Sequence, residues 1–278
     1  MTIIYHGEDH DGHCSGAIAK MYCDEHNIPS VMIPVNYGQP IPDVKGQDVV
    51  MLDFCFQPHE KMTEAILSAK SFTWIDHHIS AIKTFGNSNL EGIRDTQFSA
   101  CELAWKYFFP YDKMPKVVEL LGKYDSWRHD NDPYILGFEY FMQSLDTDPR
   151  TFDWKSYFAM PNKDVYDKSA IGTAIIRRSE LLNAKDMREA FPKDINGLHC
   201  LCLNTSSKGS SVFGNRLHEF DACIVFKRTA EGNYSCSIYA SSNNDVDVSV
   251  FASNFGGGGH KKASGFRLTK EQYDKYIG

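Results

Sequence analysis

The five-residue stretch Trp74-Ile75-Asp76-His77-His78 decides the fold of this chain. Together with Phe72, its first two residues form an apolar, β-prone run that leads directly into one carboxylate and two adjacent imidazoles. Such a run predicts a buried strand whose C-terminal end delivers polar groups to a surface crevice, where open α/β sheets place their ligands. Neighbouring residues on an extended backbone point in opposite directions, so we expect one histidine to ligate an ion while the other faces the substrate.

Two earlier segments repeat the pattern of an apolar strand that ends in an acid or an imidazole. Residues 2–5 are β-prone and lead to His6, and a polar loop over residues 7–12 then presents Asp9 and Asp11. Residues 48–52 form another apolar run, which ends at Asp53. We expect all three strands to end at the same edge of one parallel sheet.

Amphipathic helices are predicted between these strands. Their apolar residues recur at helical spacing: Cys14, Ala17, Ile18 and Met21 in the first, and Met62, Ala65, Ile66 and Ala69 in the second. A further strand is predicted over residues 30–35. Strands that alternate with helices indicate a doubly wound α/β domain with right-handed crossovers.

The remainder of the chain divides into a helical part and a second α/β part. Helices are predicted over residues 98–109 and 115–124, and residues 133–190 are helical and rich in aromatic side chains. Residues 191–197 give the strongest boundary signal. Strands are then predicted over 198–203, 222–227 and 234–240, with helices over 212–220 and 248–255. We therefore expect an N-terminal α/β domain (1–130), a helical bridge (131–191) and a smaller α/β domain (192–278), with the active cleft between the two domains.

Composition and charge exclude several classes of protein. With 42% hydrophobic and 23% charged residues, the 278-residue chain has the composition of a soluble globular protein. Its net charge of −7 disfavours a surface for long duplex DNA, but a short anionic substrate fits if metal ions supply positive charge. The eight cysteines include no Cys-x-x-Cys pair, which favours reduced thiols. Since we find no signal peptide and no membrane span, we expect a cytoplasmic protein.

The acids and imidazoles at the strand ends predict a metal centre. Each residue alone fits a solvated loop or a helix cap, but the set is more informative: His6, Asp9, Asp11, Asp53, Asp76, His77, His78 and, at the end of a predicted helix, Asp125. Several carboxylates in one crevice repel one another and stay ionised only beside cations. The mixture of carboxylate and imidazole suits manganese, iron or zinc better than calcium, and so many ligands suit a pair of ions with a bridging carboxylate. His10 and His13 are interpreted as solvent-facing loop residues.

The glycine run at residues 256–259 is followed by His260 and Lys261. Without Cβ atoms, backbone amides can approach a phosphate closely and form an anion-binding nest, to which these two side chains would add donors. The alternative interpretation of the run is a flexible linker. Lys262 is interpreted as a solvated side chain.

Taken in order, these motifs resemble the four motifs of the DHH phosphoesterase superfamily: His6-x-x-Asp9-x-Asp11-Gly12, then Asp53, then Asp76-His77-His78, then Asp125. The glycine run and His260 resemble the signature of the DHH-associated C-terminal domain of its oligoribonuclease, RecJ-like and cyclic-dinucleotide phosphodiesterase branches. The motifs span residues 6–266. The resemblance implies a DHH-type metal-binding domain over residues 1–130 and a DHH-associated substrate-binding domain over residues 192–278.

The resemblance also implies a role for each residue. The metal ligands would be divided between two ions, usually manganese: His6 and Asp9 for the first, Asp11, His77 and Asp125 for the second, and Asp53 as the bridge. His78 would face the scissile phosphate as a catalytic residue, and Asp76 would anchor the histidine segment. Substrate contacts would come from Gly258, Gly259, His260 and Lys261. Tyr239 departs from the pattern, since it stands where related proteins often carry an arginine, and it either stacks on a base or packs.

The implied reaction is metal-dependent hydrolysis of phosphodiester bonds in short oligonucleotides, or in linear or cyclic dinucleotides, to mononucleotides. One alternative is a phosphomonoesterase, a pyrophosphatase or an exopolyphosphatase, and another is a catalytically silent nucleotide-binding or sensor protein. The acidic surface argues against long polymers, and the complete ligand set argues against a silent relative. A homodimer is compatible with the sequence, which identifies neither the metal nor the polarity of cleavage.

Overall fold

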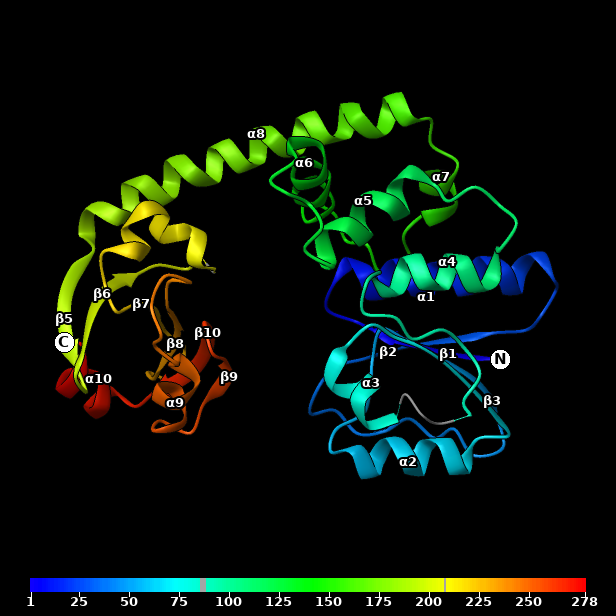
Figure 1. Ribbon diagram of the computed structural model, residues 1–278, viewed down its shortest axis with the longest axis horizontal. Helices are drawn as coiled ribbons and strands as arrows, with labels where there is room; N and C mark the ends of the chain where they lie inside the picture. The colour runs from blue at the N-terminus through cyan, green and yellow to red at the C-terminus, as the bar shows by residue number, and fades with distance from the viewer. Residues whose placement is uncertain (86–88, 208) are drawn as a thin grey trace. The chain divides into compact units, whose positions relative to one another are not determined.

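The computed structural model describes residues 1–85, 89–207 and 209–278, and the chain forms two compact units, Met1–Ile176 and Arg177–Gly278 (Figure 1). Each unit has its own sheet and its own hydrophobic core. None of the described helices has both the length and the apolar character needed to cross a bilayer. The finer division into residues 1–130, 131–191 and 192–278 stays a prediction.

The first unit is built on a sheet of four parallel strands in the order β2-β1-β3-β4. The strands are β1 (Thr2–His6), β2 (Val31–Val35), β3 (Asp48–Leu52) and β4 (Ser71–Ile75). Pro34 lies in β2, an edge strand, where the missing amide donor is tolerated. The four predicted strands and their parallel arrangement are confirmed.

Helices cover both faces of this sheet, as a doubly wound domain requires (Figure 1). On one face lie α1 (His10–Glu25) and α4 (Ala100–Phe108), and on the other lie α2 (His59–Ser68) and α3 (Ile79–Phe85). Successive side chains of β1 point to opposite faces of the sheet. Ile3 packs in the core under α1 and α4, and Ile4 packs in the core under α2 and α3. The predicted doubly wound α/β fold is confirmed.

The helical part of the chain comprises α5 (Lys116–Asp125), α6 (Pro133–Met142), α7 (Trp154–Phe158) and α8 (Asn162–Asp186). Helix α8 runs from the first unit into the second. It crosses α6 at a pair of glycines, because a Cβ on Gly172 would lie 1.7 Å from Gly137 O. The two helices can therefore approach this closely only without side chains at the crossing.

The second unit is a six-stranded mixed sheet in the order β5-β6-β7-β8-β10-β9. Its strands are β5 (Phe191–Ile195), β6 (Leu198–Asn204), β7 (Ala222–Arg228), β8 (Tyr234–Tyr239), β9 (Gly258–His260) and β10 (Ala263–Leu268). The helical segments are η1 (Met187–Glu189), η2 (Ser210–His218), α9 (Val248–Ser253) and α10 (Lys270–Tyr276). Strands β6 and β7 are parallel, and the other pairs are antiparallel.

Two segments of the second unit differ locally from the prediction. The segment 191–197, interpreted as a boundary, forms β5 and the turn into β6, where φ is 50° at Asn196 and 84° at Gly197. Two left-handed residues in succession make the tight hairpin turn that the Asn-Gly pair favours. The helix predicted over residues 212–220 is the 3-10 segment η2, which is interrupted by a non-helical Gly214.

Candidate metal centre

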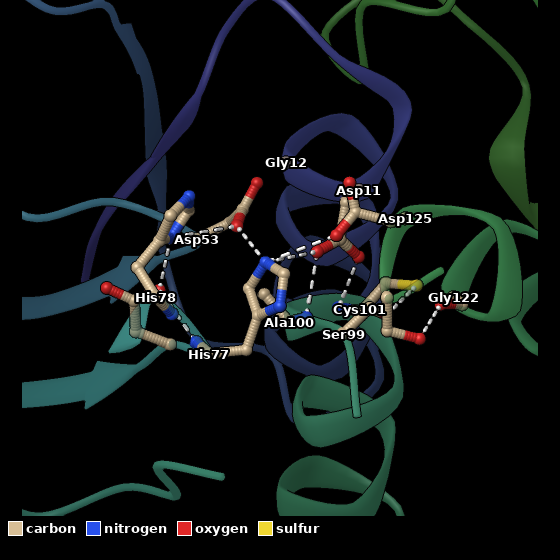
Figure 2. Close-up of polar contacts among 12 residues, drawn as sticks. Asp11, Gly12, Asp53, His77, His78, Ser99, Ala100, Cys101, Gly122 and Asp125 are labelled. Atoms are coloured by element: carbon tan, nitrogen blue, oxygen red, sulfur yellow. Dashed lines mark hydrogen bonds and ion pairs between the residues drawn. The ribbon is translucent and has the colours of Figure 1, made fainter. Parts of the chain in front are cut away.

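The predicted polar residues lie together at the carboxyl edge of the parallel sheet. Figure 2 shows five of them: Asp11, Asp53, His77, His78 and Asp125. Their ligand atoms form three groups, in each of which the atoms lie within 4.8 Å of one another: His6, Asp9 and Asp53; Asp53, His77 and His78; Asp11, His77 and Asp125. The first two groups share Asp53 and the last two share His77. The residues therefore form one continuous cluster rather than separate sites.

The turn from β1 into α1 places three of these residues. His6 ends β1, and Asp9 is the N-cap of α1, where its Oδ1 accepts a hydrogen bond from Gly12 N at 2.9 Å. Asp11, which was predicted in a loop, lies instead in the first turn of the helix. The turn depends on Gly12, where a Cβ would lie 2.2 Å from His6 O. Because the helix starts so close to the strand end, Asp9 Oδ2 lies 2.6 Å from His6 Nδ1.

Asp53 lies at the middle of the cluster. It follows β3, its side chain is 2% exposed, and its amide donates to Ile75 O of the neighbouring strand at 3.0 Å. One carboxylate oxygen lies 3.7 Å from His6 Nδ1, and the other lies 3.3 Å from His77 Nε2. A carboxylate with one oxygen toward each half of the cluster is suited to bridge two ions.

Asp76 organises the two histidines. Both backbone amides donate to Asp76 Oδ1, at 2.7 Å for His77 and 3.1 Å for His78, and His78 Nδ1 lies 2.7 Å from the same oxygen. The expectation that the two imidazoles point in opposite directions is wrong, since their ring centres are 4.7 Å apart and both rings lie beside Asp53 Oδ1. Strand alternation does not apply here, because both residues lie beyond β4 and the Asp76 carboxylate turns the backbone.

Helix α4 fixes the carboxylate of Asp11. The amides of Ala100 and Cys101, in the first turn of α4, each donate to one of its oxygens at 2.8 Å (Figure 2). Asp11 Oδ2 and Asp125 Oδ2 then lie 3.6 Å and 3.2 Å from His77 Nε2. The start of α4 therefore orients the Asp11 carboxylate, which still lies close to the His77 imidazole.

A capping box at the start of α4 extends this support. The Ser99 hydroxyl accepts from the amide of Glu102, and the Glu102 carboxylate accepts from the amide of Ser99. Glu102 is buried and also pairs with Arg128, which lies just beyond the end of α5 and Asp125. Glu102 thus links the helix that holds Asp11 to the end of the helix that carries Asp125. The sequence interpretation missed this link, although Ser-x-x-Glu before an apolar run is a capping-box signal.

Burial and mutual repulsion keep protons in the centre when ions are absent. Burial, with the charges of Asp11 and Asp9, raises the pKa of Asp53 well above its usual range. Burial, with the charges of Asp11 and Asp53, raises the pKa of Asp125 to about 9. Burial alone would lower the pKa of His6, but the neighbouring carboxylates of Asp53 and Asp9 raise it to about 10. The cluster therefore carries more carboxylate than it can ionise without cations.

His6 Nδ1 and Asp76 Oδ2 are buried without a hydrogen-bond partner among the described residues, and so are two carboxylate oxygens close to His77, Asp53 Oδ1 and Asp125 Oδ2. Buried polar atoms are nearly always partnered in folded proteins, so the two oxygens close to His77 indicate a ligand. A cation would satisfy both oxygens and would also compensate the negative charge. The residues present therefore fit divalent metal ions, and the mixture of oxygen and nitrogen donors suits manganese, iron or zinc.

The interpretation of His10 and His13 as solvent-facing residues is wrong. His10 Nδ1 lies 2.8 Å from Glu139 Oε1 on α6, and His13 Nδ1 lies 2.8 Å from Thr147 Oγ1. Both histidines belong to the first turns of α1, next to Asp11. They hold the start of this helix against the helical part of the unit, and none of the three ligand groups includes them.

In the second unit, the glycine run belongs to the end of α9 and to the edge strand β9. Gly256, with φ of 71°, ends the helix, and the amide of Gly257 donates to Ala252 O at 3.0 Å. A Cβ on Gly257 would lie 2.1 Å from Gly265 O of β10, so the run packs closely on the sheet. The flexible-linker alternative is therefore wrong. The side chain of His260 lies outside the described part of the structure, and substrate binding by Gly258, Gly259, His260 and Lys261 stays a prediction.

Two further side chains of the second unit form internal contacts. The hydroxyl of Tyr239 accepts a hydrogen bond from Gly209 N at 3.0 Å, and its ring contacts Phe213. Of the two roles considered for Tyr239, these contacts favour packing. Lys262 is not simply solvated, because its Nζ donates to the carbonyl oxygens of Asn244 and Val246.

Comparison with known proteins gives two relatives in sequence. No protein-family model matches the chain. Uncharacterized protein R106 of Acanthamoeba polyphaga mimivirus is 26% identical over 290 residues, which cover 96% of this chain and 67% of that protein. Oligoribonuclease NrnB of Bacillus subtilis (strain 168) is 24% identical over 243 residues, and here the chain spans only 58% of the relative.

Three solved structures share the fold over 99% of this chain. A pGpG-specific phosphodiesterase, PggH from Vibrio cholerae, has a TM-score of 0.57 at 12% identity and is covered over 95% of its length. An exopolyphosphatase-related protein from Bacteroides fragilis has a TM-score of 0.55 at 14% identity and is covered over 88%. Exonuclease RecJ bound to manganese has a TM-score of 0.53 at 13% identity and is covered over 87%. The chain therefore has the two-domain α/β fold of these structures, as the predicted resemblance to the DHH phosphoesterase superfamily implies.

Proposed function

We propose that this chain is a metal-dependent phosphodiesterase that hydrolyses short oligonucleotides, or linear or cyclic dinucleotides, to mononucleotides. The observation that carries the proposal is the cluster of carboxylates and imidazoles at the sheet edge, in which the buried oxygens Asp53 Oδ1 and Asp125 Oδ2 accept no hydrogen bond from the described residues. The sequence similarity to an oligoribonuclease and the fold shared with a pGpG-specific phosphodiesterase support this class of substrate.

We assign the centre to two divalent ions, Mn²⁺ for preference. His6 and Asp9 would hold the first ion and Asp11, His77 and Asp125 the second, with Asp53 as the bridge. This division is supported by two of the ligand groups, one with His6, Asp9 and Asp53 and the other with Asp11, His77 and Asp125. The third group joins them, because it contains both Asp53 and His77. When bound, the ions would supply Lewis acidity and would bring the ionisation of a water molecule close to neutral pH.

His78 is the residue that we assign to the substrate. Its side chain is 38% exposed, and its Nδ1 is held by Asp76 Oδ1, which leaves Nε2 for the substrate. The hydrogen bond to Asp76 raises the pKa of His78, so the ring is better able to carry a proton near neutral pH. A protonated ring would neutralise a phosphoryl oxygen or protonate the leaving group. Asp76 acts through His78, because it fixes the orientation of the ring.

We assign the grip on substrate phosphates to Gly258, Gly259, His260 and Lys261. Strand β9 lies at the edge of its sheet, so one side of its backbone makes no pairing within the sheet. Glycines at this edge let a phosphate approach the amides closely. The complete set of ligands in the first unit argues against a catalytically silent nucleotide-binding protein.

The test is hydrolysis of a substrate panel by the Mn²⁺-loaded protein: linear dinucleotides, cyclic dinucleotides, phosphoadenosine phosphate and polyphosphate. We expect mononucleotides to be released from dinucleotides. Asp53→Asn should lose both ions and essentially all turnover while it stays folded, because asparagine also tolerates the φ of 55° at this position. Asp24→Asn is the matched control, since Asp24 pairs with Lys20 on the surface of α1. Activity on polyphosphate alone would overturn the proposed substrate class, and two ions per chain in Asp53→Asn would overturn the bridging role.

A further inference from the structure

Helix α5 ends, directly after Asp125, in a motif that normally requires glycine. The amide of Trp127 donates to Tyr124 O at 3.1 Å, and the amide of Arg128 donates to Lys123 O at 2.9 Å. These two bonds define a Schellman motif in which the residue after the cap has a left-handed backbone. That residue is Trp127, with φ of 57°.

Tryptophan is an exceptional residue type for this conformation. The described part of the chain contains six non-glycine residues with positive φ, and the five others are all asparagine or aspartate: Asn27, Asp53, Asp130, Asn131 and Asn196. Asparagine and aspartate tolerate this region, but for a bulky side chain it is an outlier. Strained residues of this kind persist where function selects them.

The turn does not depend on the indole of Trp127, because its neighbours hold it from within. The Ser126 hydroxyl donates to Gly122 O at 2.6 Å, and Arg128 Nε donates to Ser126 Oγ at 2.8 Å. Arg128 also pairs with the buried Glu102. The indole is 84% exposed, so it contributes little apolar burial to the fold.

The exposed indole belongs to a row of rings beside the metal centre. The ring of His129 lies 5.6 Å from that of Trp127 and 5.7 Å from that of Tyr124, on which it stacks with an interplanar angle of 26°. Trp127 follows Asp125 by two residues, so the two Cα atoms are at most about 7.6 Å apart. Asp125 is in turn 3.2 Å from His77. The row of rings therefore lies on the residues that directly flank a proposed metal ligand in the chain.

We propose that Trp127, supported by His129, is a stacking platform for a nucleobase of the substrate. This inference rests on the proposed function and adds to it the residue that recognises the base. The charges around the platform favour a base over a phosphate, since Asp130 and Asp132 are exposed nearby while the charge of Arg128 is paired with Glu102. A flat, uncharged heterocycle can stack on an indole beside carboxylates, whereas a phosphate there would be repelled.

The first test compares two substrates and three variants, all Mn²⁺-loaded. The substrates are the linear dinucleotide pApA and its analogue in which one base is replaced by an abasic tetrahydrofuran residue. Trp127→Gly should lower kcat/KM for pApA by about tenfold or more, mainly through KM, and should have much less effect on the abasic analogue. Trp127→Phe should retain most of the wild-type activity, because it keeps a ring. Tyr111→Ala is the control, since Tyr111 is 99% exposed and precedes α5, whereas Trp127 follows the end of this helix.

The second test measures binding without turnover. Of the four tryptophans, Trp74, Trp105 and Trp154 are buried, so iodide should quench the fluorescence of Trp127 selectively. We expect saturating AMP to remove this quenching in the Mg²⁺-loaded protein, and Trp127→Phe to lack the iodide-sensitive emission. Unchanged quenching at saturating AMP, or an unchanged kcat/KM of Trp127→Gly for pApA, would overturn the platform. A wild-type protein that cleaves no dinucleotide but is protected by AMP would instead overturn the proposed reaction and leave the platform supported.

The third test separates binding from folding. If the indole is retained for binding, Trp127→Gly should raise the midpoint of thermal unfolding by about 2–4 °C, because glycine is the preferred residue at this position of the motif. The same variant should bind dinucleotides about tenfold more weakly or worse, as in the first test. A lower midpoint for Trp127→Gly would show that the indole stabilises the fold, and it would overturn the inference that function holds it there.

Discussion

Loading the metal-free centre with Mn²⁺ should release protons, because three of its groups hold protons that bound ions must displace. Imidazole nitrogens and carboxylate oxygens ligate metals in their deprotonated forms. The pKa of His6 is raised to about 10 and that of Asp125 to about 9. The pKa of Asp53 is raised in the same direction by its burial and by the neighbouring carboxylates.

The size of the effect follows from these values. At about pH 7.5, a group with a pKa near 9 is protonated in about 97% of the molecules, and one with a pKa near 10 in nearly all of them. A proton on Asp53 weakens the attraction that holds the proton on His6, because the two groups lie 3.7 Å apart. Such coupled groups titrate together, so we expect about two protons per fully loaded chain rather than three.

Isothermal titration calorimetry in buffers of different ionisation enthalpy measures this number. Asp125→Asn should release about one proton fewer than the wild type. Glu119→Gln is the control, since hydrogen bonds from Lys123 and Lys116 outweigh burial and lower the pKa of this carboxyl, which belongs to none of the ligand groups. Wild-type protein that binds Mn²⁺ without releasing protons would refute the description of the centre.

The same protons set the pH dependence of stability. Because the pKa values of Asp53 and Asp125 are raised in the folded state, their contribution is fully present below about pH 4 and is lost as the pH rises toward the folded pKa, about 9 for Asp125. The free energy of unfolding of the metal-free protein should therefore fall by about 1.4 kcal/mol per pH unit for each retained proton. With Mn²⁺ the trend should reverse, since metal binding tightens as the ligands deprotonate. Urea unfolding at pH 6 and pH 8 measures both trends, and a metal-free protein that is more stable at pH 8 contradicts the first.

The other predictions concern single residues. His77→Ala should lower the metal content, whereas His78→Ala should keep the metals and mainly lower kcat; equal metal loss in elemental analysis would mean that the pair is misassigned. Gly122→Ala should lower the free energy of unfolding in urea by about 1–3 kcal/mol, because a Cβ would lie 2.5 Å from Glu102 Cγ; an unchanged value would show that Glu102 moves aside freely. His260→Ala should lower kcat/KM for dinucleotides much more than for bis(4-nitrophenyl) phosphate, because remote contacts position the larger substrate. Full dinucleotide activity in that variant would remove His260 from substrate binding.

The fold of the first unit could be predicted because its elements follow two simple periods. The run over residues 48–52 is apolar on both faces, as a central strand of a covered sheet must be, and Val49 and Val50 are both buried. Met62 and Ala65 recur at helical spacing and are the buried residues of α2. Polar residues directly after such strands then had to meet at one edge. Neither step needs information from elsewhere in the chain.

The orientation of the residues within the centre could not be predicted in the same way, because it depends on contacts that periodicity does not contain. His77 and His78 lie side by side since one oxygen of Asp76 accepts both of their amides. Asp11 is oriented by the amides of Ala100 and Cys101, about ninety residues further along the chain. The capping box at Ser99 was visible in the sequence, but its proximity to Asp11 required the packed structure.

Asp53 in the centre and Trp127, two residues after Asp125, share a left-handed backbone, and they should respond to substitution in opposite ways. At Asp53, asparagine keeps the backbone preference and removes only the charge, so the variant should lose metal and with it the stability that bound ions supply. At Trp127, glycine removes the ring and relieves a conformation that costs about 1–2 kcal/mol in an ordinary L-residue. That variant should gain stability as it loses the base. Residue type predicts neither backbone conformation, so these two positions become visible only in the structure, where they coincide with a residue that we assign to metal and one that we assign to substrate.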